Sequence, residues 1–109
     1  MNDAFTDLAQ LDRTLHAPPR LAILTVLLNC ARADFTFLVT ATGLTKGNLA
    51  SNLARLEAAG LVVAEKEVRA SGVRTTLRLT GKGREATEAH WARLESIKQR
   101  VVSIPAGSV

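Results

Sequence analysis

The sequence contains no tyrosine, one tryptophan and a single cysteine among its 109 residues. One cysteine, Cys30, cannot form a disulfide within the chain, so a reducing, cytoplasmic location is expected. The longest largely apolar stretch, residues 21–28, is much shorter than the roughly 20 residues of a membrane-spanning helix. The first residues have no basic segment ahead of an apolar run, which argues against a secretory signal peptide. No membrane association is therefore expected.

The side chains from which metal sites and active sites are built are also scarce. The two histidines, His16 and His90, do not form a metal-ligand spacing with Cys30. Cys30 itself lies in an apolar stretch, where it is expected to be a small core residue. The sequence has no nucleophile elbow, no phosphate-binding loop and no paired acidic motif. We therefore expect no catalytic activity, no metal ion and no cofactor.

The whole chain has a formal net charge of +4, and its excess of positive charge lies in one part of the sequence. Residues 45–84 hold eight Lys and Arg against three Glu, a net of +5, whereas residues 1–44 sum to −1 and residues 85–109 to 0. One contiguous basic block on a small domain is typical of a surface that binds nucleic acid. An ordinary solvated face is the alternative interpretation of the same block.

The spacing of apolar residues predicts a mostly α (α+β) domain with one β-hairpin. The expected elements are helices over residues 5–15, 19–31, 37–42, 45–59 and 80–101, a short extended piece over 34–36, and strands over 61–69 and 73–80 joined by a turn at 70–72. Pro18 and Pro19 end the first helix and open the second. Gly43 suits a left-handed position after the short helix, and Thr45 is a natural N-cap of the helix that follows.

Residues 37–59 have the arrangement of a helix-turn-helix motif. Leu49, Leu53 and Leu56 form the buried stripe of its second helix, which leaves a polar side facing outward where a recognition helix enters the major groove. The residues expected to contact DNA from this helix are Thr45, Lys46, Gly47, Asn48, Ser51, Asn52 and Arg55. The lysine suits guanine or a phosphate, the two asparagines suit adenine, and the first-turn amides suit a phosphate. The alternative is that these residues are only capping and solvated side chains.

The hairpin is expected to make a second contact with DNA. Arg69 and Arg74 flank its tip, and Lys66 lies nearby. A basic hairpin beside a recognition helix reaches an adjacent minor groove or a row of phosphates. The alternative is an edge hairpin whose charges prevent aggregation.

Two stretches of the sequence carry a family pattern. The first runs from Leu44 to Leu53 and continues as Leu-Glu-Ala-Ala-Gly-Leu-Val over residues 56–62, and the second is Leu-Thr-Gly-Lys-Gly-Arg-Glu-Ala over residues 79–86. They resemble the recognition helix and the strand-to-helix junction after the wing in MarR- and ArsR-like winged-helix regulators. The resemblance covers roughly residues 10–95 and implies a dimeric transcriptional regulator, similar to the short stand-alone members. The wing lacks the basic, proline-rich tip common in these families, and the chain has little room for the additional dimerisation helices of longer MarR proteins.

The first and last predicted helices carry apolar stripes that a small winged-helix core cannot cover fully. We therefore expect a homodimer in which the last helix packs on its symmetry mate and the first helix wraps against it. Two recognition helices then meet successive major grooves about 34 Å apart. The expected interface residues are Phe5, Leu8, Leu11, Leu15, His90, Trp91, Leu94, Ile97 and Val101. Packing of both helices within a monomer is the alternative.

Together these observations predict a winged helix-turn-helix domain with a two- to three-stranded wing. The expected division is one domain over residues 1–104, with an N-terminal dimerisation helix over 1–17, a winged core over 18–80, a C-terminal dimerisation helix over 80–102 and a flexible tail over 105–109. The predicted function is sequence-specific binding of double-stranded DNA by a dimeric repressor, through residues 45–59 and 66–76. Two alternatives remain, a protein–protein interaction module and a ligand-responsive switch, and the sequence shows no effector pocket.

Overall fold

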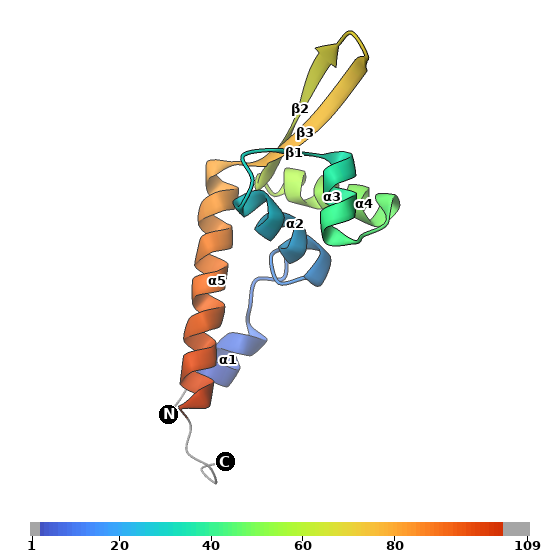
Figure 1. The fold of residues 1–109 in the computed structure, drawn as a ribbon. Coiled ribbons are helices and arrows are strands. Elements are labelled where there is room, and N and C mark those ends of the chain that lie inside the picture. The colour runs from blue at the N-terminus through green and yellow to red at the C-terminus, as the bar shows by residue number, and fades with distance from the viewer. Residues whose placement is uncertain (1–2, 104–109) are drawn as a thin grey trace.

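The structure is a computed structural model that describes residues 3–103. The elements are α1 (Ala4–Ala9), α2 (Pro18–Leu28), β1 (Ala33–Asp34), α3 (Phe35–Thr42), α4 (Lys46–Ala58), β2 (Val62–Arg69), β3 (Gly72–Leu79) and α5 (Gly81–Val102), as Figure 1 shows. The predicted order of helices and strands is confirmed, and it is the order of a winged helix. The tail predicted over residues 105–109 lies outside the described residues. No helix within residues 3–103 combines the length and the apolar character needed to cross a bilayer.

The three strands form one antiparallel sheet in the order β1-β3-β2. The short β1 pairs with the end of β3 nearest the helices, where Ala33 lies opposite Leu77. The outer part of the hairpin has no third strand, and it ends where Arg69 pairs with Gly72 across a two-residue turn. Gly72 has a φ of +124°, a backbone conformation that residues other than glycine rarely adopt. In Figure 1 this hairpin projects away from the helices as a wing.

The main hydrophobic core lies between α2, α3, α4 and the base of the sheet. Its fully buried large side chains are Ile23, Leu24, Leu27, Leu38, Leu49 and Leu56. Helix α2 contributes three of them because its sequence is apolar nearly all round, which is typical of a central buried helix. Full burial of each such side chain contributes roughly 1.5–3 kcal/mol, so aliphatic packing holds α4 in place from behind.

A second, smaller core lies at the other end of the molecule. Helix α1 packs against the C-terminal half of α5, where Ala4, Leu11 and Ile97 are buried with Leu94 and Val101 beside them. Figure 1 shows this pair of helices extending from the winged core, at the end opposite the wing. The molecule is therefore elongated, with principal extents of 65 × 26 × 21 Å.

The prediction of a first helix over residues 5–15 is wrong, because α1 ends at Ala9. A continuous helix would place Leu11 and Leu15 on one side, four residues apart, whereas the structure buries them in different cores. The chain therefore leaves the helix after α1, and Asp12 Oδ1 accepts a hydrogen bond from the amide of Thr14 at 2.8 Å. This is the local turn that aspartate favours.

Two further boundaries differ from the prediction. Helix α2 ends at Leu28 rather than residue 31, and Asn29 is its C-cap. Helix α3 begins at Phe35, two residues earlier than expected, because Asp34 Oδ1 accepts from the amide of Phe37 at 2.7 Å and acts as the N-cap. The extended piece is accordingly limited to β1.

The end of α4, the base of the wing and the start of α5 meet at one junction. Thr80 caps α5, since its Oγ1 accepts from the amide of Gly83 at 2.9 Å, and the same hydroxyl donates to the carbonyl of Gly60 at 2.6 Å. The amide of Thr80 donates to the carbonyl of Leu61 at 3.0 Å, and Lys82 Nζ donates to the carbonyl of Ala59 at 2.9 Å. Helix α4, the wing and α5 are thus fixed to one another by hydrogen bonds to backbone groups.

Candidate nucleic-acid interface

Helix α4 separates a buried leucine stripe from an exposed polar surface. Leu49 and Leu56 are fully buried and Leu53 is 5% exposed. Six of the seven predicted contact residues on α4 and its N-cap are exposed: Thr45, Lys46, Gly47, Asn48, Ser51 and Arg55. The seventh, Asn52, is half-buried. No other part of the described chain therefore covers the N-terminal end of this polar surface.

The start of α4 has the features of a phosphate site. The turn before it is set by Gly43, whose φ of +70° is the predicted left-handed position. Thr45 is the predicted N-cap, and its Oγ1 accepts from the amide of Asn48 at 3.1 Å. The amides of Lys46 and Gly47 belong to the first turn, where a helix offers no internal acceptor. A Cβ at Gly47 would meet nothing within 4 Å, so packing within the chain does not require glycine there.

A side-chain cluster behind this surface was missed by the sequence analysis. Arg20, at the start of α2, donates from Nη1 to Asn52 Oδ1 at 3.1 Å. Asn52 Nδ2 in turn donates to both the carbonyl and the side-chain oxygen of Asn48. The one available signal was that Arg20 is the only Lys, Arg, Asp or Glu between Arg13 and Arg32, and a lone charge in an apolar helix needs partners.

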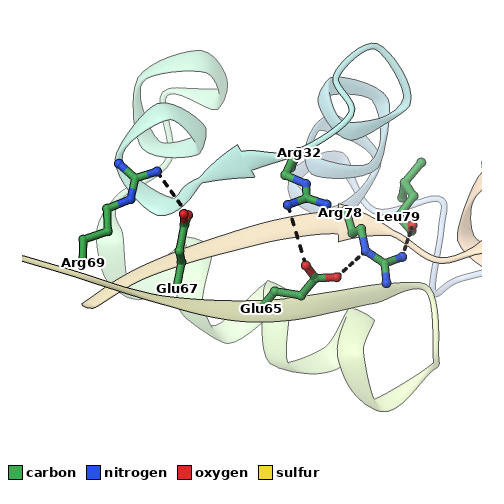
Figure 2. A network of polar contacts seen from close by, with 6 residues as sticks. All are labelled: Arg32, Glu65, Glu67, Arg69, Arg78 and Leu79. Atoms are coloured by element: carbon green, nitrogen blue, oxygen red, sulfur yellow. Dashed lines mark hydrogen bonds and ion pairs between the residues drawn. The ribbon is translucent and has the colours of Figure 1, made fainter. Parts of the chain in front are cut away.

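Two arginines of the wing are engaged with carboxylates. Arg69 Nη2 lies 3.1 Å from Glu67 Oε2 (Figure 2), and Arg74 Nη2 lies 2.9 Å from Asp34 Oδ2. Surface pairs of this kind contribute little stability and are screened by salt. Both arginines therefore remain free to exchange a carboxylate for a phosphate. Lys66, the third predicted wing contact, is exposed.

A second ionic cluster lies at the middle of the hairpin (Figure 2). Arg78 Nε donates to Glu65 Oε1, and Arg32 Nη1 lies 3.9 Å from Glu65 Oε2. The hydrogen bond and the positive charge of Arg78 hold the pKa of Glu65 below its usual value. Glu65 is thus a stable anion that balances two arginines, which leaves the wing less basic than its count of Lys and Arg indicates.

Close to its turn the wing carries two exposed apolar side chains, which the sequence did not predict. Val68 and Val73 are cross-strand neighbours, and they are 84% and 64% exposed. Arg69 lies between this pair and the turn, whereas Arg74 and Lys66 lie further toward the base, so the two valines are set among the predicted basic side chains.

The residues predicted for a dimer interface divide into two groups. Leu11, Leu15, His90 and Ile97 are buried within one chain, and their place at a dimer interface stays a prediction. Leu15 belongs to the main core, Leu11 and Ile97 to the second core, and the ring of His90 packs against that of His16. Phe5, Leu8 and Trp91 are exposed, and Leu94 and Val101 are half-buried.

An open apolar cavity of about 490 Å³ lies between the start of α2 and α5. Its lining includes Pro18, Leu21, Val26 and Trp91. The indole of Trp91 donates from Nε1 to Thr25 Oγ1 at 3.0 Å and so bridges the two helices. Within residues 3–103, no cluster of three or more His, Cys, Asp or Glu side chains is placed to hold a metal ion.

Comparison with known proteins adds independent information. A family model described as a winged helix DNA-binding domain matches residues 20–98. The curated protein MJ0432 of Methanocaldococcus jannaschii is 37% identical over 67 residues, which cover 62% of this chain and 73% of that protein.

Solved structures show the same fold. The transcriptional regulator homologue protein from Pyrococcus horikoshii superposes with a TM-score of 0.81 at 27% identity, covering 94% of this chain and 99% of that chain. The transcriptional repressor CouR, solved on a 23-mer DNA duplex, has a TM-score of 0.71 at 22% identity, covering 96% of this chain and 71% of that chain. Two MarR-family regulators from Silicibacter pomeroyi also share the fold.

Proposed function

Because the chain belongs to the family of winged helix DNA-binding domains and has the fold of MarR-type transcriptional regulators, we propose that it is a homodimeric repressor that reads a pseudo-palindromic operator through α4 and the wing. The observation that carries this proposal is the uncovered polar end of α4, with Lys46, Asn48 and Ser51 exposed in front of a fully packed leucine stripe. A regulator of this kind works in the cytoplasm, where it blocks transcription by occupying its site.

In the proposed complex, the N-terminal half of α4 enters the major groove. Lys46, Asn48 and Ser51 read base edges, and Thr45 with the first-turn amides holds a phosphate. Arg55, Lys66, Arg69 and Arg74 contact the DNA backbone or the neighbouring minor groove, and the two wing arginines leave Glu67 and Asp34 to do so.

The proposed dimer is supported by the apolar surface that one chain leaves open. Phe5 and Leu8 on α1 are 56% and 48% exposed, and Trp91 on α5 is 44% exposed beside the apolar cavity. A second copy of the chain, placed around a two-fold axis, covers these surfaces with the same residues of its own. Its α4 then meets the next major groove, about 34 Å away.

Selection of bound fragments from a random duplex pool tests the DNA proposal, followed by titration of the selected site at increasing salt. We expect a two-fold symmetric consensus and a steep, linear fall of log K with log salt. Lys98 is an exposed lysine on α5, far from α4, so Lys98→Ala is expected to bind the selected site like the wild type although it has lost one positive charge. Enrichment of no sequence, or binding that salt leaves unchanged, would show that the exposed face of α4 serves another partner such as a protein.

Light scattering at micromolar concentration tests the dimer. We expect twice the mass of one chain for the wild type and a shift toward the monomer for the double variant Phe5→Ser, Leu8→Ser. Because both side chains are about half exposed, their replacement leaves the main core intact. A wild-type protein that is monomeric under these conditions contradicts the proposed assembly.

The apolar cavity beside Trp91 favours a second candidate function, the binding of a small apolar effector. Its size lies within the range of small-molecule sites, and its lining is largely apolar. A panel of small neutral aromatic compounds, tested by thermal unfolding, is expected to raise Tm in the wild type more than in a Leu21→Trp variant with a filled cavity. Equal shifts in both proteins would remove this candidate.

A further inference from the structure

One arginine on the buried side of α4 reaches the recognition surface from behind. Besides its bond to Asn52, Arg20 donates from Nε to the carbonyl of Thr14 at 2.7 Å and from Nη2 to the carbonyl of Arg13 at 2.9 Å. A guanidinium is rigid and planar, so three bonds to three separate acceptors fix its position. Arg20 therefore connects the segment between α1 and α2 to the recognition helix.

The bond from Arg20 determines which way the Asn52 amide points. A guanidinium only donates hydrogen bonds, so it must face the oxygen of Asn52, and the opposite orientation would set two donors against each other. The amide nitrogen of Asn52 consequently faces Asn48. It donates to the Asn48 carbonyl at 2.9 Å and also to Asn48 Oδ1.

Asn48 is oriented by the same reasoning. Its Oδ1 accepts from Asn52, so its own NH₂ group points away from Asn52, and the residue is exposed on α4. In the major groove, guanine, adenine and thymine each present acceptors, whereas the edge of cytosine presents a donor, its N4 amino group. An Asn48 amide held in this orientation pairs with the first three bases and meets cytosine donor to donor.

We propose that Arg20 is a specificity-determining positioning residue, which holds Asn52 so that Asn48 presents its amide hydrogens to a base and rejects cytosine at that position. This inference rests on the proposed function, because it requires that α4 enters the major groove. Within residues 3–103, Arg20 forms no ion pair with a carboxylate, and its partners are two backbone carbonyls and the Asn52 amide. Three hydrogen bonds thus hold the Arg20 guanidinium in place, and the one to Asn52 links it to the exposed face of α4.

The test uses the full chain and its selected operator. The base position read by Asn48 is first identified as the one where Asn48→Ala loses discrimination. Binding is then measured to the operator and to its three single-base variants at that position, for the wild type, Arg20→Met, Asn52→Leu and the double variant. Arg93→Met, an exposed arginine on α5, is the matched control.

We expect the wild type to bind the operator with cytosine at this position most weakly. Arg20→Met and Asn52→Leu are each expected to lose about tenfold of that discrimination. The double variant is expected to lose no more than either single variant, because both remove one connected chain of hydrogen bonds. Non-specific affinity and its salt dependence remain as in the wild type, since neither residue touches a phosphate. A purely structural role would instead lower Tm and all affinities together.

Arg20→Met also removes the two bonds to the segment before α2, so it risks a loss of folding. Asn52→Leu leaves those two bonds in place and therefore decides the matter by itself. Full discrimination in folded Asn52→Leu, or cytosine as the preferred base, overturns the inference while sequence-specific binding still stands. Unchanged discrimination in Asn48→Ala overturns it as well. Failure of the wild type to select any DNA sequence overturns the proposed function, and the inference with it.

Discussion

The junction between the wing and α5 makes a sharp prediction for Gly83. This residue is buried in the first turn of α5, and a Cβ added there would lie 1.9 Å from the carbonyl oxygen of Leu61 and 2.8 Å from its carbonyl carbon. These are backbone atoms of the residue just before β2, and the same oxygen accepts from the amide of Thr80. The exchange Gly83→Ala therefore forces α5 and β2 apart.

The expected change in the free energy of unfolding combines one stabilising and two destabilising effects. Alanine favours a helix over glycine by about 0.8–1 kcal/mol. Against this, forcing an extra carbon into a packed site costs about 1–3 kcal/mol, and weakening the bond between Thr80 and Leu61 costs about 1 kcal/mol more. The net destabilisation is about 2 kcal/mol, which lowers Tm by roughly 10 °C in a domain of this size.

Urea denaturation followed by circular dichroism measures this difference. Gly81→Ala is the matched control, because it lies two residues earlier in α5 and its added Cβ would meet nothing within 4 Å. We expect Gly81→Ala to be as stable as the wild type or slightly more stable. If Gly83→Ala unfolds at the same urea concentration as the wild type, or if both variants lose equal stability, contact with Leu61 does not account for the glycine.

Three further predictions concern the wing, the buried histidine and the core. Lys66→Ala is expected to weaken binding to all DNA sequences alike and to reduce the slope of log K against log salt by about one, whereas Lys98→Ala leaves both unchanged. Burial, with a smaller contribution from the neighbouring imidazole, lowers the pKa of His90. The unfolded chain then binds the proton more readily than the folded protein, so the free energy of unfolding is fully retained above about pH 6.5 and falls as the pH drops below it. Urea denaturation between pH 5 and 8 shows this loss for the wild type and a smaller one for His90→Gln. Leu24→Ala, at a fully buried position, is expected to cost about 2–5 kcal/mol in the same assay, and Leu8→Ala, at a half-exposed one, much less.

Local signals in the sequence predicted most of the fold. The turn at Gly43 and the cap at Thr45 each depend on residues within four positions, so the local sequence was enough to predict them. The leucine stripe of α4 likewise follows from helical spacing alone. The polar face opposite that stripe could be placed for the same reason.

The features that the sequence did not predict depend on contacts between distant segments. Leu11 and Leu15 have the spacing of one helical stripe, yet each is drawn into a different core, and α1 ends early as a result. The bond from Arg20 to Asn52 spans 32 positions, and the contact of His16 with His90 spans 74. No periodicity links such residues, so only the folded chain brings them together.

Trp91 gives this protein a built-in optical probe. The chain has no tyrosine and no other tryptophan, so its ultraviolet fluorescence originates almost entirely from one indole. That indole is partly open to water, bridges α5 to α2 through Thr25, and borders the apolar cavity. The wavelength of its emission maximum and its quenching by iodide therefore report on one site, the contact between α5 and α2. Association, effector binding and a shift of α5 are each readable there without attaching a dye.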